Sequence, residues 1–179
     1  MFWQRKSISV RWPDMPLPNF AARSSVRKLW IGASNTAKID SLPDITRFDS
    51  LRDLTIGWFP FNQIPPQVFQ LTSLRQLTIL NCPINDLPDG IANLINLRKL
   101  AIRGGNLNQI PDSILKLRKL EYLDLANNQI VSVGPTILKL ERLKFLGLHA
   151  NWNCNVDDQI LNRENLRLFE PQSVSASIV

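Results

Sequence analysis

A leucine recurs every 23 residues through most of this chain. The leucines that open the same phrase are Leu51, Leu74, Leu97, Leu120, Leu143 and Leu166. Val26 opens a further unit 25 residues before Leu51, so the first unit carries a two-residue insertion. A repeat that keeps its length and phase predicts a solenoid, because one such unit has too small a core to fold alone and must stack on its neighbours.

The spacing of apolar residues changes within each unit. Positions 1, 4 and 6 are apolar, as in Leu120, Leu123 and Leu125, and the step from 4 to 6 has the period of a strand with one buried face. Apolar residues at positions 11, 14, 18 and 21 follow with helical spacing. Three units have a proline at position 15: Pro65, Pro88 and Pro111. Because proline fits the first residue of a helix, each unit is predicted as strand, turn, short helix or 3₁₀ segment, and return.

The phrase LxxLxLxxNxL resembles the leucine-rich-repeat signature over residues 26–169, and the unit from Leu120 matches it at every fixed position. The resemblance implies an α/β leucine-rich-repeat solenoid, a curved right-handed superhelix. Its parallel β-sheet would form the concave face, with short helices or 3₁₀ segments on the convex face. In the family, the asparagine at position 9 bridges the turns of adjacent coils. The residues at position 9 here are Ser34, Phe59, Cys82, Gly105, Asn128 and Asn151. Cysteine is an accepted substitute, so we expect less regular turns only towards the N-terminal half.

Two subgroups of this family share features with the sequence. Units reading IPxxIxxLxxLxxLxLxxN are similar to 23-residue intracellular repeats of bacterial proteins, including host-directed effectors, and of Ras-group scaffolds. Residues 77–83, followed by Leu87-Pro88, instead resemble the repeats of plant nucleotide-binding immune receptors. Those receptors carry a phosphate-binding loop, GxxxxGK[ST], which this sequence lacks.

The repeat phase divides the chain into four segments. Residues 1–25 are predicted as an N-terminal capping segment, in which Ile8, Val10 and Trp12 alternate as in a strand, and residues 26–165 as six repeats. Residues 166–171 read as a partial seventh repeat and C-terminal cap, with Phe169 at position 4 and Pro171 ending the strand. Residues 172–179 are expected to be a disordered tail, whose last three residues fit the loose consensus of PDZ-domain ligands.

The strand phrase also predicts a candidate binding face. Because positions 4 and 6 face the core, positions 3, 5 and 7 face outward, with position 8 beside them. Aromatic residues and arginine are enriched at binding hot spots, and the repeat demands no large aromatic side chain at these positions. We therefore predict that a protein partner binds on this concave face. The candidate contact residues are Lys28, Trp30, Asp53, Thr55, Trp58, Gln76, Thr78, Leu80, Lys99, Arg103, Tyr122, Asp124, Phe145 and His149.

Position 2 forms a basic column, made of Arg27, Arg52, Arg75 and Arg98. With a formal charge of +6, the column could attract an acidic partner or a nucleic acid. A long basic residue at this position also solvates the sheet edge, and no stacking aromatics alternate with the column. We therefore expect a protein partner and no nucleic acid.

The residues needed for chemistry are missing. The single histidine, His149, precedes Cys154 by five residues, and no third residue is evident that would orient its ring as a catalytic base. No CxxC or HExxH spacing is present, and Asp157-Asp158 reads as a polar helix start. The sequence predicts no catalytic residue, cofactor, metal site or small-molecule substrate. No apolar run approaches the ~20 residues that cross a bilayer, so we expect no membrane partner.

The two cysteines bear on the cellular compartment. Cys82 and Cys154 lie about three coils apart, too far for a disulfide, which predicts free thiols in a reducing compartment. The first residues lack the apolar region of a secretory signal. We expect a cytoplasmic protein, or one delivered into a host cytosol without a cleaved signal.

Its expected role is a non-catalytic interaction module, as a scaffold, regulator or host-directed effector. The alternative is the substrate-recognising region of a larger enzyme, such as a bacterial effector ubiquitin ligase, or of a plant-type immune receptor.

Overall fold

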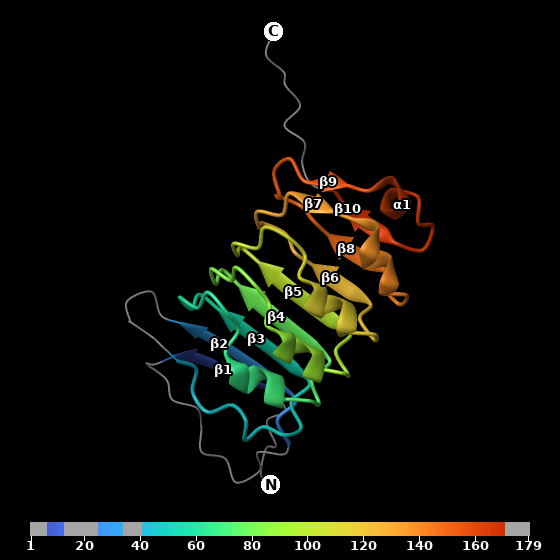
Figure 1. Cartoon of the computed structure of the whole chain (residues 1–179). Coiled ribbons are helices and arrows are strands. Elements are labelled where there is room, and N and C mark those ends of the chain that lie inside the picture. Colours follow the sequence, from blue (N-terminus) through green and yellow to red (C-terminus); the bar gives the residue numbers. More distant parts are fainter. Residues whose placement is uncertain (1–6, 13–24, 34–40, 171–179) are drawn as a thin grey trace.

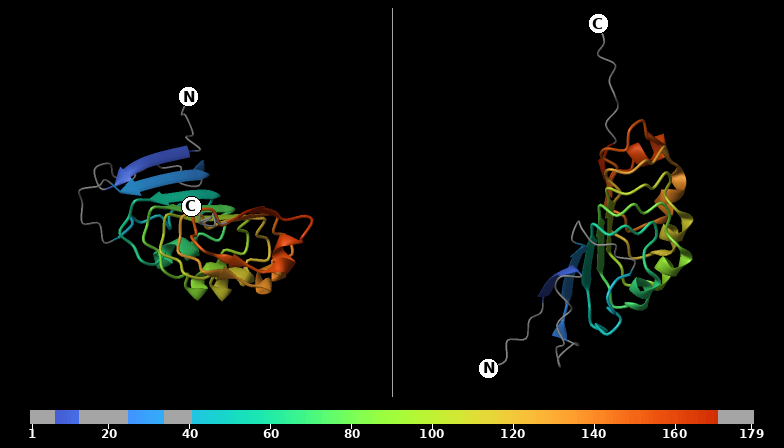
Figure 2. Two further views of the ribbon diagram at one scale, coloured as in Figure 1. Left: turned by 90° about the horizontal axis from the view of Figure 1, so that it is seen from above. Right: turned by 90° about the vertical axis from the view of Figure 1, so that its left-hand side faces the viewer.

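The chain stacks into two layers, a parallel sheet on one side and a row of short 3₁₀ segments on the other (Figures 1 and 2). The computed structural model describes residues 7–12, 25–33 and 41–170. The eight strands of the sheet lie in the order β1-β2-β3-β4-β5-β6-β8-β10. They are β1 (Ser7–Trp12), β2 (Lys28–Ala33), β3 (Asp53–Gly57), β4 (Gln76–Leu80), β5 (Lys99–Arg103), β6 (Tyr122–Asp124), β8 (Phe145–Gly147) and β10 (Arg167–Phe169).

The return segments are mostly 3₁₀ turns. They are η2 (Pro66–Gln70), η3 (Asp89–Asn93), η4 (Asp112–Lys116) and η5 (Pro135–Lys139). Near the C-terminal end, a two-stranded sheet of β7 (Ser132–Val133) and β9 (Asn155–Val156) precedes the helix α1 (Asp158–Leu161). The Asp157 side chain accepts a hydrogen bond from the Gln159 amide at 2.9 Å, which confirms the polar helix start predicted at Asp157-Asp158.

The prolines at position 15 stand one residue earlier than predicted. Pro88 and Pro111 have extended ψ angles of 156° and 142° and precede η3 and η4 as their N-caps. The prediction that they form the first helical residue is therefore wrong by one position. A proline ring fixes φ at a value that suits extended and helical backbone alike, so the residue type alone does not separate the two positions.

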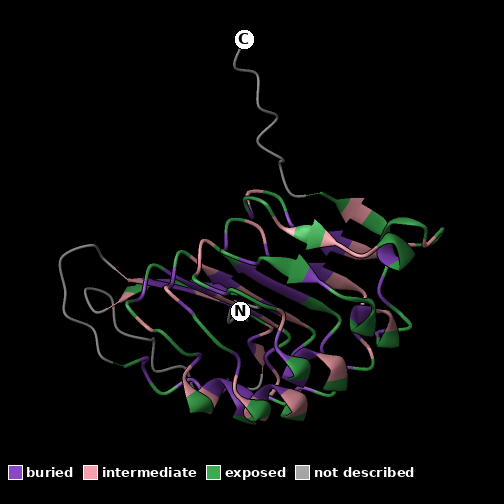
Figure 3. Ribbon diagram, turned by 45° about the horizontal axis from the view of Figure 1, so that its top comes forward, coloured by how far each residue is buried: buried purple, intermediate pink, exposed green. Residues whose placement is uncertain are grey.

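Equal repeat positions lie side by side across the sheet. Leu77 pairs with Leu54 and with Leu100, and Leu100 pairs with Leu123. The side chains of Leu54, Leu77, Leu100 and Leu123 are all 0% exposed. Figure 3 shows buried residues along the strands and in the 3₁₀ segments opposite them. The predicted repeat register and leucine-rich-repeat fold are confirmed.

The two asparagines at position 9 bridge adjacent coils as the resemblance implied. The Asn128 amide donates to the carbonyls of Ile102 and Leu125, and its Oδ1 accepts from the Leu107 amide at 3.2 Å. Asn151 repeats the pattern one coil later, with its Oδ1 accepting from Ile130 at 3.0 Å. Each side chain therefore satisfies buried backbone groups that no strand partner reaches.

The turns keep one geometry where these asparagines are absent. Position 8 has a positive φ in every unit from the second to the sixth: Trp58, Asn81, Gly104, Asn127 and Ala150. The backbone amides of Trp58 and Asn81 donate to the carbonyls of Leu80 and Arg103 in the next coil, as Asn127 does to His149. The expectation of less regular turns is therefore wrong at this position, because backbone bonds between coils maintain the turn. The first unit's turn, which contains Ser34, lies outside the described residues.

The last strand departs from the 23-residue spacing. Leu166 keeps position 1, because its amide donates to Arg163 as that of Leu143 does to Leu140. Arg167, Leu168 and Phe169 then align with positions 3, 4 and 5 of β8, so position 2 is skipped. Phe169 is consequently 57% exposed. Its prediction as a position-4 residue is wrong, and Leu168 takes that place.

At the other end, β1 pairs in parallel with β2 over six residues, with Ile8 and Val10 buried. The predicted Pro171 strand end, the tail at 172–179 and its Ser177-Ile178-Val179 motif lie outside the described residues.

Candidate functional site

The side of the eight-stranded sheet turned away from the 3₁₀ segments, called here the open face, carries positions 3, 5 and 7 of each strand. Five of the fourteen candidate residues are exposed: Lys28, Trp58, Lys99, Arg103 and His149. Eight are half-buried: Trp30, Asp53, Thr55, Gln76, Thr78, Leu80, Tyr122 and Phe145. The remaining residue, Asp124, is buried, with 3% of its surface exposed.

Three aromatic rings follow one another over the last strands, and we call them the C-terminal aromatic cluster. Tyr122 and Phe145 stack with ring centroids 4.2 Å apart and planes 4° from parallel. Phe169 adds a tilted ring 5.9 Å from Phe145. Sequence reasoning missed Phe169, because Leu166 and Phe169 also fit positions 1 and 4 of an unbroken repeat.

Asp124 lies on the open face, but its neighbours Arg103 and Tyr122 cover it. Its Oδ2 accepts a hydrogen bond from the Nε of Arg103 at 2.8 Å and one from the Tyr122 hydroxyl at 3.1 Å, and Nη2 of Arg103 is a further donor to it. Its Oδ1 accepts from the Ala126 amide at 3.1 Å. The hydrogen bond that Arg103 donates to Asp124 raises the pKa of the Arg103 guanidinium. Burial and the same carboxylate raise the pKa of the Tyr122 hydroxyl. Asp124 is therefore a positioning residue for Arg103 and Tyr122.

Two tryptophans form a second cluster, the tryptophan pair, near the N-terminal end. The rings of Trp30 and Trp58 lie 6.1 Å apart at 57°. The Trp30 indole covers Gly32, where a Cβ would collide with the ring. Trp58 has a φ of 61° and is 48% exposed, and a left-handed backbone is strained for so bulky a residue.

The position-2 column is broken by pairing. Arg98 forms an ion pair with Glu121 at 2.6 Å, and Arg27 donates to the Ser50 carbonyl at 2.9 Å. Among the described residues, Arg52 and Arg75 form no ion pair. The column therefore offers two unpaired arginines rather than a continuous basic stripe.

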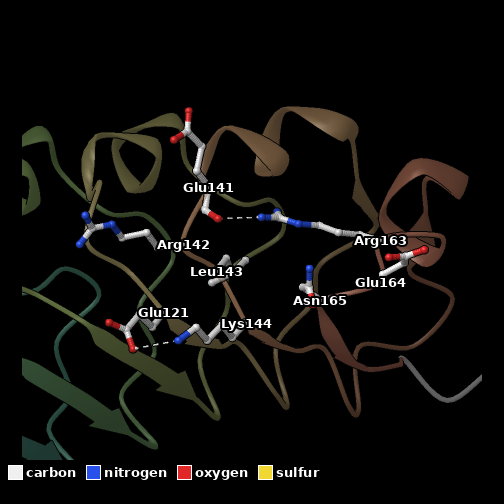
Figure 4. Close-up of a pocket in the computed structure, with 8 residues that line it drawn as sticks. All are labelled: Glu121, Glu141, Arg142, Leu143, Lys144, Arg163, Glu164 and Asn165. Atoms are coloured by element: carbon white, nitrogen blue, oxygen red, sulfur yellow. Dashed lines mark hydrogen bonds and ion pairs between the residues drawn. The ribbon is translucent and has the colours of Figure 1, made fainter.

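A depression of about 870 Å³ lies away from the open face, at the edge where the last strands begin (Figure 4). Its charged lining residues are Glu121, Glu141, Arg142, Lys144, Arg163 and Glu164. Figure 4 shows the Lys144–Glu121 contact of 4.0 Å and the Arg163 bond to the Glu141 carbonyl at 2.9 Å. The charges balance in sign, and the lining holds no cysteine, serine or histidine that would act as a nucleophile or base.

The thiols do not have the chemistry of nucleophiles. Cys82 and Cys154 are both free, and burial raises the pKa of each thiol above its ordinary value of 9.0. A reactive cysteine needs a lowered pKa. Within the described ranges, no group of three or more His, Cys, Asp or Glu is placed to hold a metal ion. No helix in the same ranges is long and apolar enough to span a membrane.

A parallel sheet with 3₁₀ turns between its strands defines a class of solenoid that recurs among bacterial proteins of known structure. A sequence profile of the leucine-rich repeat matches residues 95–151. Residues 95–151 therefore contain leucine-rich repeats, and the chain has the leucine-rich-repeat fold. Domains of this type are typically protein-binding modules without catalysis, and no catalytic family is identified here. No curated protein sequence matches the chain significantly.

Three solved structures illustrate the fold. A leucine-rich-repeat protein of Leptospira interrogans has 21% identity and a TM-score of 0.62, covering 84% of this chain and 44% of that one. The internalin InlF of Listeria monocytogenes has 18% identity and a TM-score of 0.60, covering 84% and 50%. The internalin InlC2 of the same species has 17% identity and a TM-score of 0.57, covering 83% and 69%. The chain thus spans about half the length of the first two, and the likeness is one of fold.

Proposed function

We propose that this chain is a non-catalytic module that holds a protein partner on the open face of its sheet. The observation that carries the proposal is the gathering of large aromatic side chains into two clusters on a face whose repeat requires none. The five residues are Trp30, Trp58, Tyr122, Phe145 and Phe169. Rings of this kind supply large contact areas at low entropic cost, and they dominate measured binding hot spots.

The strained backbone of Trp58 supports the same proposal. A residue held at a φ of 61° in the left-handed region costs about 1–2 kcal/mol unless it is glycine or asparagine. Asn81, Gly104 and Asn127 occupy the equivalent place in three later coils. The fold does not require a half-exposed tryptophan in their position, and strain of this type gathers at functional sites.

The proposal is tested by affinity capture with a matched aromatic control. Tyr122→Ala/Phe145→Ala removes the stacked pair, and Trp152→Ala removes an aromatic ring that is 57% exposed in the turn after β8. We expect the double variant to lose a specifically captured partner by about tenfold or more, because two hot-spot aromatics are removed. Trp152→Ala should retain the partner, and all three proteins should melt cooperatively. Equal capture by the double variant and wild type would contradict the face assignment.

We further propose that the protein works in the cytoplasm. The support is chemical, since both cysteines are free thiols and such thiols persist in reducing compartments. Rapid alkylation of lysed native cells, followed by mass spectrometry, measures the state of Cys154, which is the more exposed of the two. A reduced thiol is the expected result, and a mixed disulfide on most molecules would contradict the assignment.

A further inference from the structure

We infer that the open face binds an acidic peptide segment, and that two neighbouring side chains of this segment make the main contacts. One carboxylate binds the free edge of Arg103, and a neighbouring aromatic or large aliphatic side chain packs on the C-terminal aromatic cluster. This inference rests on the proposed function and specifies the partner of the same site.

Arg103 is held in place before any partner arrives. Its Nε and Nη2 both donate to the buried Asp124 carboxylate, and Nη2 lies 3.4 Å from the Tyr122 hydroxyl. Nη1 has no hydrogen bond within the described residues, and the side chain is 49% exposed. A guanidinium fixed on one edge loses little conformational freedom when its other edge binds an acceptor. Arg103 is therefore a preorganised anchor for an anionic group.

The local charge favours a carboxylate over a phosphate group. Asp124 already offsets the single charge of Arg103, so the pair alone is close to neutral. A phosphate carries nearly two charges at neutral pH and is usually bound by several cations. The other basic residue of the same strand, Lys99 at position 3, is four residues from Arg103 and so does not place a second cation beside it. One remaining guanidinium edge matches the single charge and planar shape of a carboxylate.

The anchor and the apolar cluster share one residue. The Tyr122 ring stacks on Phe145, while its hydroxyl donates to the Asp124 carboxylate that holds Arg103. An anionic group of the partner bound to Arg103 and an apolar side chain of the partner packed on the stacked rings would therefore both contact Tyr122. This spacing fits neighbouring residues of one peptide segment better than two remote parts of a partner.

The wider face has the complementary charge for an acidic segment. Among the described residues, three acidic side chains stand on the open face and the position-2 column: Asp53, Glu121 and Asp124. Ten basic side chains share these positions: Arg11, Arg27, Lys28, Arg52, Arg75, Arg98, Lys99, Arg103, Lys144 and Arg167. Complementary potential of this kind speeds association and rejects basic competitors.

The test is a selection from random peptides displayed on phage, using the whole chain as bait. We expect the selected peptides to be enriched in Asp or Glu beside Phe, Tyr, Trp or Leu. Synthetic copies should bind Arg103→Gln about tenfold or more weakly, because a hydrogen-bonded charge pair is lost. The matched control is Arg75→Gln, which removes one exposed, unpaired arginine of the column and should change binding less than about twofold.

A second variant keeps the test independent of folding. Arg103→Gln leaves the buried Asp124 carboxylate with fewer donors, whereas Arg103→Gln/Asp124→Asn removes both charges together and preserves the net charge. Thermal melts of both variants accompany the binding measurements. If the double variant melts like wild type and still binds the peptides fully, the anchor is wrong.

The outcomes separate the inference from the proposed function. Selected peptides that need Tyr122 and Phe145 but lack acidic residues, or that bind Arg103→Gln and Arg75→Gln equally, overturn the carboxylate anchor alone. Selected peptides that are indifferent to Tyr122→Ala/Phe145→Ala overturn the face assignment as well. Complete displacement of the peptides by a single-stranded oligonucleotide with Arg103-dependent affinity would replace the acidic segment with nucleic acid.

Discussion

At the residue scale, the open face contains side chains whose local conformations the fold does not need. Trp58 is the clearest, with its left-handed backbone and its ring half exposed beside Trp30. Asparagine and glycine occupy the same position in three other coils, and these residues favour such a turn. The burial of Asp124 could not be predicted, because it depends on Arg103, 21 residues earlier, reaching across from the neighbouring strand.

Replacing Trp58 should separate stability from binding. Trp58→Asn relieves roughly 1 kcal/mol of backbone strain and loses a ring contact worth about as much. We therefore expect a free energy of unfolding within about 1 kcal/mol of wild type by urea denaturation, with partner binding weakened about tenfold or more. Ala150→Asn, at the equivalent position with a φ of 56°, is the control and should be neutral or stabilising without loss of binding. A Trp58→Asn protein that keeps full affinity would remove the tryptophan pair from the site.

At the element scale, the sheet is built from strands so similar that one phrase predicts nearly all of them. Apolar residues at positions 4 and 6 predicted the buried apolar side chains of β3, β4, β5, β6 and β8, because alternation along a strand leaves no other face for them. The phrase failed at β10, where Leu166, Leu168 and Phe169 fit the pattern in two registers. The structure adopts the shorter one, which buries Leu168 partly and places Phe169 outward. Periodicity cannot resolve a one-residue slip when both candidate core positions are apolar.

Glycine in β8 provides a test of how closely the site is packed. A Cβ at Gly147 would lie 2.8 Å from the Asp124 Oδ1 and 3.0 Å from the Phe145 ring. Gly147→Ala should therefore displace the residues that hold Arg103 and the aromatic stack, lowering the free energy of unfolding by roughly 1–3 kcal/mol and weakening binding. The matched change is Gly57→Ala in β3, where the nearest neighbour, Leu80, lies at an ordinary 3.6 Å. If urea denaturation shows the two variants to be equally stable and isothermal titration shows equal affinity, the described packing around Asp124 is incorrect.

At the scale of the whole molecule, charge and aromatic surface coincide on one side. Among the described residues, the open face and the position-2 column hold ten basic side chains but only three acidic ones. The other described residues include more acidic than basic side chains, so the positive charge of the described part of the chain lies on this side. The stacked coils bury a continuous core behind the sheet, which leaves the outward side chains free to vary without disturbing the fold. Fold and binding surface are in this way separate properties of the same strands.

The central claim, that a partner occupies the open face, is tested most directly by hydroxyl-radical footprinting of the free chain and of its complex with a captured protein or selected peptide. We expect slower oxidation of Trp58, Tyr122, Phe145 and Phe169 in the complex, because the partner covers their rings. Trp152, in the turn after β8, should oxidise at the same rate in both states. Protection of Trp152 with unchanged oxidation of the open-face aromatics would show that the partner binds elsewhere.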